Sequence, residues 1–399
     1  MSEPVVDKPR GLTSEQVLAM ILPANVSHGH GGHLFDADNV EYIDMVSAWG
    51  TNILGYGYPR IAKAVSAQIA KYANLGMAGP EYGRLQALLL KRIPCAEAVH
   101  FVKNGSDATS AAVRLARAAT KREKVLHRGY HGVQDWWMAS QRTPGVPATH
   151  HGQITSLATL DVESVRAALA AHPGQYACLI IDPMLWPITN RFAMREIRDL
   201  VAADGGLLIF DEVVSGFRVA VGGMQEVWDV TPDLACYGKG IANGLPLSVL
   251  VGREKWMKDI QSINYSLSFG LEAVSMVAAI ETISEIVERD VCADLADKGR
   301  LLKDVFADLA RERGIRAALV GHDCRPQLEF QDAPGVPGAT SHYIAVQELA
   351  RQKICTYGTL SLCYAHTQDD IAAVIRGLEC ALYKVGWTIH QNAPSKAAA

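Results

Sequence analysis

The chain has 399 residues, of which 49% are hydrophobic and 20% are charged, and its formal net charge is −4. A chain of this length builds a large core and favours two subdomains, while a slightly acidic balance without a basic stripe argues against a nucleic-acid partner. No uncharged apolar run of about 18 residues occurs, and the N-terminal stretch lacks the basic and apolar regions of a secretory signal. We therefore expect no membrane span and place the protein in the cytoplasm.

The eight cysteines are scattered along the chain and form no CxxC motif. That distribution argues against a disulfide framework or a zinc ribbon, so we expect small buried hydrophobic side chains in a reducing compartment. The positions are Cys95, Cys178, Cys236, Cys292, Cys324, Cys355, Cys363 and Cys380.

The N-terminal part of the chain has the pattern of extended structure as far as residue 58. Two short apolar runs, 33–35 and 40–46, flank the turn-forming residues 36–39 and predict a β-hairpin. Residues 60–72 then repeat apolar side chains at helical spacing and predict a helix.

From about residue 80 onward, helical patterns alternate with short apolar strands. The predicted elements are a helix at 84–93, a strand at 98–102, a helix at 110–120, a strand at 176–182, a helix at 194–205 and a strand at 206–213. Continuous apolar strands in such an alternation indicate an α/β fold with a mostly parallel central sheet covered by helices on both faces. Ligands bind beyond the carboxyl ends of such strands, where Asp182, Asp211 and Lys239 lie.

A long helix is predicted from near Glu272 through residue 291, leading into a C-terminal α/β unit at roughly 290–385. We expect three segments: an N-terminal part of a small domain at 1–59, a large domain at 60–285 and the C-terminal part of the small domain at 286–399. The tail at 391–399 is expected to be disordered.

Lys239 stands between Gly238 and Gly240, just after a short apolar run. Glycines let the backbone approach a ligand closely, and an amine near an apolar strand end can attack a carbonyl to form a Schiff base. Asp211 ends another apolar strand, where a buried carboxylate needs a cationic partner such as a protonated pyridine nitrogen. A lysine for an aldehyde and an acid for a ring nitrogen are what pyridoxal 5′-phosphate requires.

The turn before the helix at 110–120 is a candidate phosphate site. Residues 104–107, Asn-Gly-Ser-Asp, offer free backbone N–H groups and a helix dipole to a dianion, although an ordinary N-cap turn has the same sequence pattern. The ring of Tyr130, in the sequence Tyr-His-Gly, would stack on a planar cofactor.

Two further patterns admit other functions. Glycines 238, 240 and 244 approach a dinucleotide-binding loop, but they miss its spacing by one residue and enclose a lysine where the backbone must contact a pyrophosphate. His28, His30 and His33 have a spacing that can bind a metal, yet no cysteine or HExxH motif accompanies them. We expect an exposed or substrate-facing loop there and no metal.

Six blocks in residues 28–380 resemble the class III aminotransferases of fold type I, and among these the subgroup similar to glutamate-1-semialdehyde aminomutase. The blocks are FVKNGSDATSAAVRLARAAT, GYHGVQDWW, LLIFDEVVSGFRV, TPDLACYGKGIANGLPLSVLVGRE, SLSFGLEAVSM and CYAHTQDDI. No single block is specific, but six in order over nearly the whole chain are. The resemblance implies a large pyridoxal-phosphate-binding domain and a smaller α/β domain built from the two terminal segments.

The resemblance also implies a role for each matching residue. Lys239 forms the Schiff base with the cofactor and later moves the proton, and Asp211 pairs with the ring nitrogen. The other implied cofactor contacts are Val213 and Tyr130 on the two ring faces, and Gly105 and Ser106 at the phosphate.

Two further matches concern a partner subunit and the substrate. Ser268 and Phe269 match the position that reaches the phosphate of the neighbouring subunit, which implies a homodimer with shared active sites. Trp49 matches an aromatic residue on the substrate side.

The chain departs from the family pattern at three places. The family's usual Ser-Gly-Thr-Glu is Asn-Gly-Ser-Asp at 104–107, its Glu-Pro is Asp-Pro at 182–183, and its Phe-Gly-Gly is Phe-Gly-Leu at 269–271. The cofactor residues are intact, so the departures bear on the substrate more than on the chemistry. Candidates for binding a substrate carboxylate are Arg84, Arg191, Arg218 and Arg325.

The leading functional hypothesis is a pyridoxal-phosphate-dependent aminotransferase that moves an amino group from a donor amine or amino acid to a keto or aldehyde acceptor. The sequences KNGSDAT and ANGLPLSVLVGRE most resemble those of family members linked to sugar or secondary-metabolite pathways. An aminomutase or racemase on the same scaffold is the alternative, and full turnover without a second substrate would select it. A non-catalytic cofactor-binding protein is the third hypothesis, which a missing cofactor absorbance would favour.

Overall fold

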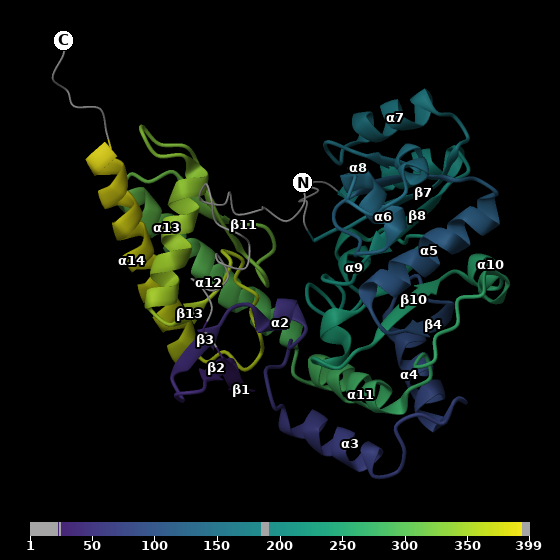
Figure 1. The fold of residues 1–399 in the computed structure, drawn as a ribbon, viewed down its shortest axis with the longest axis horizontal. Helices are drawn as coiled ribbons and strands as arrows, with labels where there is room; N and C mark the ends of the chain where they lie inside the picture. The colour runs from purple at the N-terminus through teal and green to yellow at the C-terminus, as the bar shows by residue number, and fades with distance from the viewer. Residues whose placement is uncertain (1–22, 24, 185–190, 393–399) are drawn as a thin grey trace. The chain divides into compact units, whose positions relative to one another are not determined.

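The computed structural model describes residue 23 and residues 25–184 and 191–392, and it forms two compact units (Figure 1). Unit 1 spans Pro59–Asp290, and unit 2 combines the described residues up to Tyr58 with those from Val291 onward. The extended structure predicted for residues 1–22 lies outside the described residues. So does most of the predicted disordered tail, but its first two residues, Gln391 and Asn392, are instead the end of a helix.

A seven-stranded sheet forms the centre of unit 1. Its strands, in spatial order, are β4 (Ala98–Val102), β10 (Ser248–Gly252), β9 (Leu234–Tyr237), β8 (Leu207–Asp211), β7 (Tyr176–Ile181), β5 (Lys124–Arg128) and β6 (Ile154–Ser156). From β9 to β6 all neighbours are parallel, whereas β10 is antiparallel to both β9 and β4. Two antiparallel steps restore the direction, so β4 also ends at the same edge as β9, β8, β7 and β5. The predicted mostly parallel sheet is confirmed.

The strands are apolar on both faces because helices cover both. Every residue of β7, β8, β9 and β10 is buried. The helices of unit 1 are α3 (Pro59–Ile69), α4 (Pro80–Arg92), α5 (Gly105–Thr120), α6 (Asp135–Met138), α7 (Val162–Ala171), α8 (Arg191–Ala203), α9 (Met224–Trp228), α10 (Glu254–Met257) and α11 (Ala273–Glu288). Short 3₁₀ turns lie at Ala139–Gln141, Ala148–Gln153, Lys239–Ala242 and Ile260–Ile263.

Helix α11 is shorter than the sequence predicts. Its N-cap is Glu272, whose carboxylate accepts hydrogen bonds from the first-turn backbone, including Ser275 N at 3.2 Å. The helix ends at Glu288, and Asp290 has a φ of +50°, which lies outside the helical region. The predicted helix through residue 291 is therefore wrong at its end, because a new helix begins at Val291.

Unit 2 contains two sheets and the remaining helices. The strands are β1 (Val26–His30), β2 (His33–Asp36), β3 (Glu41–Asp44) and β13 (Ile354–Cys355) in one sheet, and β11 (Ala317–Val320) and β12 (Gln327–Phe330) in the other. The helices are α12 (Val291–Glu312), α13 (Gly338–Arg351) and α14 (Gln368–Asn392). The predicted hairpin is confirmed as β2–β3, with His33 opposite Ile43.

A left-handed turn, labelled α2, follows β3 at Ser47–Gly50 (Figure 1). Ser47, Ala48 and Trp49 have φ values of 51°, 47° and 61°, which L-residues adopt only at a cost of about 1 kcal/mol or more each. The buried Asp44 carboxylate holds the entry to this turn, since it accepts from Ser47 N at 3.1 Å.

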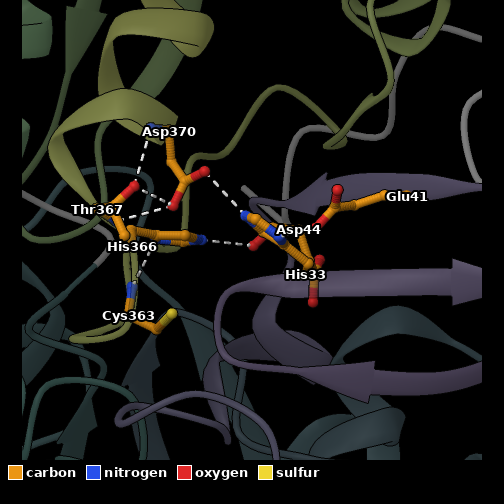
Figure 2. A network of polar contacts seen from close by, with 7 residues as sticks. All are labelled: His33, Glu41, Asp44, Cys363, His366, Thr367 and Asp370. Atoms are coloured by element: carbon orange, nitrogen blue, oxygen red, sulfur yellow. Dashed lines mark hydrogen bonds and ion pairs between the residues drawn. The ribbon is translucent and has the colours of Figure 1, made fainter.

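A polar network joins the hairpin to the start of α14 (Figure 2). His33 bridges two carboxylates, with Nδ1 2.6 Å from Glu41 Oε1 and Nε2 2.8 Å from Asp370 Oδ1. Next to it, His366 Nε2 donates to the backbone oxygen of Asp44 at 3.1 Å. His33 therefore lies in a carboxylate-lined bridge within unit 2, and within the described ranges no cluster of three or more metal-ligating side chains is found.

All eight cysteines have free thiols. Six are buried as predicted, but Cys292 is half-buried and Cys380 is exposed, because each lies toward the outer side of its helix. Among the described residues, no helix has both the length and the hydropathy that crossing a bilayer requires.

Candidate active site

Three of the predicted site residues follow neighbouring strands of the large sheet. Asp182 comes directly after β7, Asp211 ends β8, and Lys239 follows β9 by two residues. Burial raises the pKa of Asp182 and that of Asp211 to about 7, and the positive charge of Lys239 opposes the shift at both carboxyls. The predicted convergence at the carboxyl edge is therefore present: one amine acts electrostatically on two buried acids.

Lys239 has an unusual backbone. Its φ of +45° lies in the left-handed region, and the residue begins the 3₁₀ turn Lys239–Ala242. Such a conformation at a non-glycine residue costs about 1 kcal/mol or more and is concentrated at functional sites. Lys239 itself is half-buried, whereas Gly238 and Gly240 on either side are buried.

The Asp211 carboxylate is hydrogen-bonded through both oxygens. Oδ2 lies 2.8 Å from His131 Nδ1, and Oδ1 accepts from Val213 N at 3.3 Å. Both side chains are buried, and burial lowers the pKa of His131 to about 4. His131 is thus a neutral imidazole that fixes the orientation of Asp211. Sequence reasoning gave His131 no role, although it adjoins the predicted Tyr130 in the loop after β5.

Glu212, the next residue along, serves the structure instead. Its fully buried carboxylate accepts from Met224 N at 2.9 Å and from Gln225 N at 3.0 Å, and it also bonds the Ser215 hydroxyl. These are first-turn groups of α9, so Glu212 satisfies donors that the helix leaves unpaired. The two adjacent acids therefore have different partners, because successive side chains leave a strand on opposite faces.

The predicted phosphate turn begins α5. The Asp107 carboxylate turns back and accepts from Asn104 N at 2.8 Å, which closes a capping box. This arrangement directs the acidic side chain to Asn104 and leaves the first-turn N–H groups of Gly105 and Ser106 at the helix N-terminus. Ser106 Oγ accepts from Val133 N at 3.3 Å, in the loop that carries Tyr130 and His131.

Val213 brings the phosphate turn and the lysine segment together. A Cβ added at Gly105 would lie 2.9 Å from Val213 Cγ1, and one added at Gly238 would lie 3.4 Å from the same atom. Both glycines thus pack against one valine, and the glycine at 238 directly precedes Lys239. A side chain at position 105 would occupy the space beside Val213.

The loop of Tyr130 lies between two other parts of the site. Gly129 packs against the side chain of Asp182, and Gly132 packs against Ser106. The Tyr130 ring is 41% exposed and contacts Trp137 edge-on, with ring centroids 4.8 Å apart. Its outer surface remains accessible for a planar ligand.

The remaining predicted residues belong to other segments of the chain. The backbone oxygen of Ser268 accepts from Asn74 Nδ2 at 3.1 Å, and the Phe269 ring is 61% exposed in the loop before α11. Trp49 belongs to unit 2, where it stacks on Tyr357 with ring centroids 4.7 Å apart and an interplanar angle of 11°.

The four candidate arginines have different surroundings. Arg84 and Arg191 are exposed, and Arg218 is buried within unit 1. Arg325 Nε donates to Ser361 Oγ at 3.2 Å in unit 2.

The residues of unit 1 fit a phosphorylated pyridine aldehyde. Asp211 is a desolvated acid that a cationic ring nitrogen would return to its ionised form. Gly105 leaves room beside Val213 at a helix N-terminus suited to a dianion, and Lys239 lies within electrostatic range of Asp211.

Comparisons with known proteins agree with this chemistry. The family profile described as aminotransferase class-III matches residues 14–325. The chain is 34% identical to the 3-aminobutyryl-CoA aminotransferase of Cloacimonas acidaminovorans, over 91% of this chain and 90% of that protein. It is 32% identical to a glutamate-1-semialdehyde 2,1-aminomutase of Chloroherpeton thalassium, over 88% and 89% of the two chains.

Solved structures show the same fold. The FumI protein of Sphingopyxis sp. MTA144, solved with its PLP cofactor, superposes with a TM-score of 0.85 at 28% identity, covering 94% of this chain and 93% of that one. An omega-transaminase from Sphaerobacter thermophilus superposes with a TM-score of 0.84 at 25% identity, covering 95% of each chain. The chain therefore belongs to the class III aminotransferases, enzymes of fold type I that depend on pyridoxal phosphate.

Proposed function

We propose that Lys239, Asp211 and the turn at 104–106 form the cofactor site of this aminotransferase. Bound pyridoxal phosphate supplies an aldehyde that condenses with amines and a protonated ring that withdraws electrons from the attached carbon. Lys239 Nζ would hold the aldehyde and, once a substrate amine replaces it, carry a proton between neighbouring carbons. The observation that carries the proposal is the placement of the two residues on neighbouring strands: Asp211 at the end of β8 pairs with Cys236 of β9, and Lys239 follows β9 by two residues.

Asp211 would keep the ring nitrogen protonated. Its two oxygens are oriented by His131 Nδ1 and by Val213 N, so the carboxylate is preorganised for a charge that develops during the reaction. The first turn of α5, with Gly105 and Ser106, would bind the phosphate, and Tyr130 and Val213 would contact the ring. The joint presence of Lys239, Asp211 and the phosphate turn favours a catalytic protein over a non-catalytic cofactor-binding one.

We propose a substrate whose amino group lies away from the carbon that bears a carboxylate. Support comes from the names of two relatives, a 3-aminobutyryl-CoA aminotransferase and an omega-transaminase. Trp49 is proposed as a substrate-side residue on its sequence match alone; within unit 2 its ring is 49% exposed and stacked on Tyr357.

A half-reaction screen tests the function. Purified holoenzyme would be mixed with α-, β- and ω-amines, and conversion to the pyridoxamine form followed by absorbance. Conversion by β- or ω-amines, and recovery with a keto or aldehyde acceptor, is the expected result. Conversion by α-amino acids alone would contradict the substrate class, and no conversion by any amine would contradict the aminotransferase.

The aminomutase is the second candidate, because several relatives at 30–32% identity are glutamate-1-semialdehyde 2,1-aminomutases. An aminomutase retains the amine and needs no separate acceptor. Complete turnover of one substrate, with no second substrate present, would select this function over amino transfer between two molecules.

We further propose a homodimer in which Ser268 and Phe269 reach the partner's phosphate site. Asn74 Nδ2 holds the backbone of Ser268, so the segment with Leu75 and Met77 lies beside the loop with Phe269. The side chains of Leu75, Met77 and Phe269 are 50%, 70% and 61% exposed, and a second copy of the chain would cover them.

The free thiols of all eight cysteines support a reducing compartment such as the cytoplasm.

Light scattering with two matched variants tests the dimer. Phe269→Asp is expected to yield monomers that bind the cofactor weakly, whereas Val227→Asp, at a 52% exposed apolar residue of α9, is expected to stay dimeric. A monomeric wild-type protein with full activity would contradict the shared site.

A further inference from the structure

Three aromatic side chains behind Asp211 form a triangle in the interior of unit 1. His127 lies on β5, His131 in the loop that follows, and Trp137 on α6. Their ring centroids are 5.7 Å (His127–His131), 6.3 Å (His127–Trp137) and 6.4 Å (His131–Trp137) apart, and each pair is nearly perpendicular. All three side chains are at most 3% exposed.

Four nitrogen atoms of this triangle have no partner at hydrogen-bonding geometry among the residues that the structure describes: His127 Nδ1 and Nε2, His131 Nε2 and Trp137 Nε1. The backbone of Gly129 acts on the pKa of His127, and that of Arg128 on the pKa of His131, without reaching this geometry. Leaving one such buried group unpaired costs about 1–3 kcal/mol, and native proteins leave very few. Four of them on three adjacent rings therefore call for a shared polar occupant.

The hydrogen-bonding character of the four atoms identifies that occupant. His131 Nδ1 faces the Asp211 carboxylate, so it carries the proton, and Nε2 is left as an acceptor. Burial lowers the pKa of His127 to about 3, so this ring is also neutral and has one donor and one acceptor. Trp137 Nε1 is only a donor. The two nitrogens of one imidazole point away from each other, so a single water molecule can meet one nitrogen of His127 together with Trp137 Nε1 and His131 Nε2, that is, two donors and one acceptor.

We propose that the rings of His127, His131 and Trp137 enclose an ordered water molecule, and that His127 and Trp137 thereby act as positioning residues for Asp211. The water accepts from Trp137 Nε1 and from the N–H of His127, and it donates to His131 Nε2. That last bond holds His131 in the tautomer whose Nδ1–H points at Asp211. The proposal rests on the proposed role of Asp211 at the ring nitrogen for its effect on catalysis.

The chain offers a matched pair of variants. Trp137→Phe keeps a ring in the triangle but removes the N–H that orients the water. Trp136→Phe is the control, since this neighbouring ring also lies 6.3 Å from His131, but its Nε1 donates to Ser110 Oγ at 2.9 Å.

The tautomer of His131 is measured by ¹⁵N NMR of the histidine rings at about pH 5.5, where the imidazole is neutral and the protonated Asp211 carboxyl can either donate or accept, so that it does not fix the tautomer by itself. Recording the protein before cofactor loading separates this proposal from the cofactor assignment. Wild type and Trp136→Phe are expected to show His131 protonated at Nδ1 alone, and Trp137→Phe to show a mixture of both tautomers. In the loaded enzyme, Trp137→Phe is expected to lower kcat about tenfold with little change in KM, and to shift the pH midpoint of the cofactor absorbance.

A crystal structure of the wild type at high resolution gives a second test that needs no variant. Electron density for a water within hydrogen-bonding distance of Trp137 Nε1 and His131 Nε2 supports the proposal. A dry triangle, or equal His131 tautomer populations in Trp137→Phe and wild type, overturns it. If the tautomer shifts as expected but the cofactor absorbance does not respond, the water is upheld and the role of Asp211 is not.

Discussion

His131 Nδ1 lies 2.8 Å from Asp211 Oδ2, and both side chains are buried beside the end of β8. This bond orients a buried carboxylate whose pKa burial raises to about 7. The pair is therefore arranged to receive a positive charge.

Asp211→Asn is expected to lower kcat by at least about 100-fold while the protein stays folded, because the amide cannot keep a ring nitrogen protonated. Loss of one preorganised electrostatic partner costs about 3–4 kcal/mol in the transition state. Steady-state kinetics and thermal unfolding of the same preparation check both parts. An unchanged kcat would contradict the pairing.

Glu212→Gln is expected to lower the stability of the protein rather than its activity. The carboxylate caps α9 and bonds Ser215, so its loss is expected to lower the free energy of unfolding by roughly 1–3 kcal/mol. The kcat of the folded variant is expected to stay near that of the wild type. Urea unfolding and kinetics at low temperature check this, and a large fall in kcat without loss of stability would show that Glu212 takes part in the reaction.

The stabilisation from His33 is expected to decrease with rising pH (Figure 2). Burial alone would lower the pKa of His33, but the hydrogen bonds to Asp370 and Glu41 outweigh it and raise the pKa above the ordinary 6.5. The imidazolium therefore stabilises the fold fully below pH 6.5, and this contribution is lost as the pH rises through the folded-state pKa.

Comparing wild type with His33→Gln by urea unfolding, between about pH 6 and about pH 9, measures this effect. The difference in free energy of unfolding should shrink toward high pH. His30→Gln, at an exposed histidine on β1, is the control and should show no such trend. A difference that stays constant with pH would contradict the charged bridge.

Arg60 joins α3 to three glutamates of α11, and its loss should have a salt-dependent effect. Its guanidinium nitrogens lie 2.6 Å from Glu281, 2.8 Å from Glu285 and 2.7 Å from Glu288. Arg60→Met leaves three like charges on one helix and is expected to cost roughly 1 kcal/mol at low salt, falling as salt screens the repulsion. Arg166→Met, which removes a more exposed pair with Glu196, should cost less. Equal costs at high and low salt would contradict the electrostatic explanation.

Strands β4, β7 and β8 of the large sheet could be predicted, because they are continuous apolar runs, whereas β5, β6 and β10 were not predicted. Asp182, Asp211 and Lys239 fall at one edge because each comes at or just after the end of an apolar run. The different roles of the adjacent acids could not be predicted in the same way. Asp211 and Glu212 point to opposite faces of the strand, and Glu212 caps helix α9 through Met224, which is 12 residues further along the chain.

Contacts between loops could not be predicted from the sequence either. Gly105 meets Val213 across the sheet edge although β10 and β9 separate their strands, and nothing local to either residue encodes that approach. Helix α11 ends because the backbone of Asp290 has a positive φ, and the spacing of apolar residues carries no information about that angle. His131 was recognised as part of a block, but its bond to Asp211 required the relative placement of β5 and β8.

The most direct test of the account is to identify the lysine that binds the cofactor. Borohydride reduction of the holoenzyme fixes the cofactor to that residue, and peptide mass spectrometry then locates it. We expect the label on Lys239, and we expect the Lys239→Ala protein to be folded, unlabelled and inactive. A label on any other lysine, or normal turnover by Lys239→Ala, would contradict it.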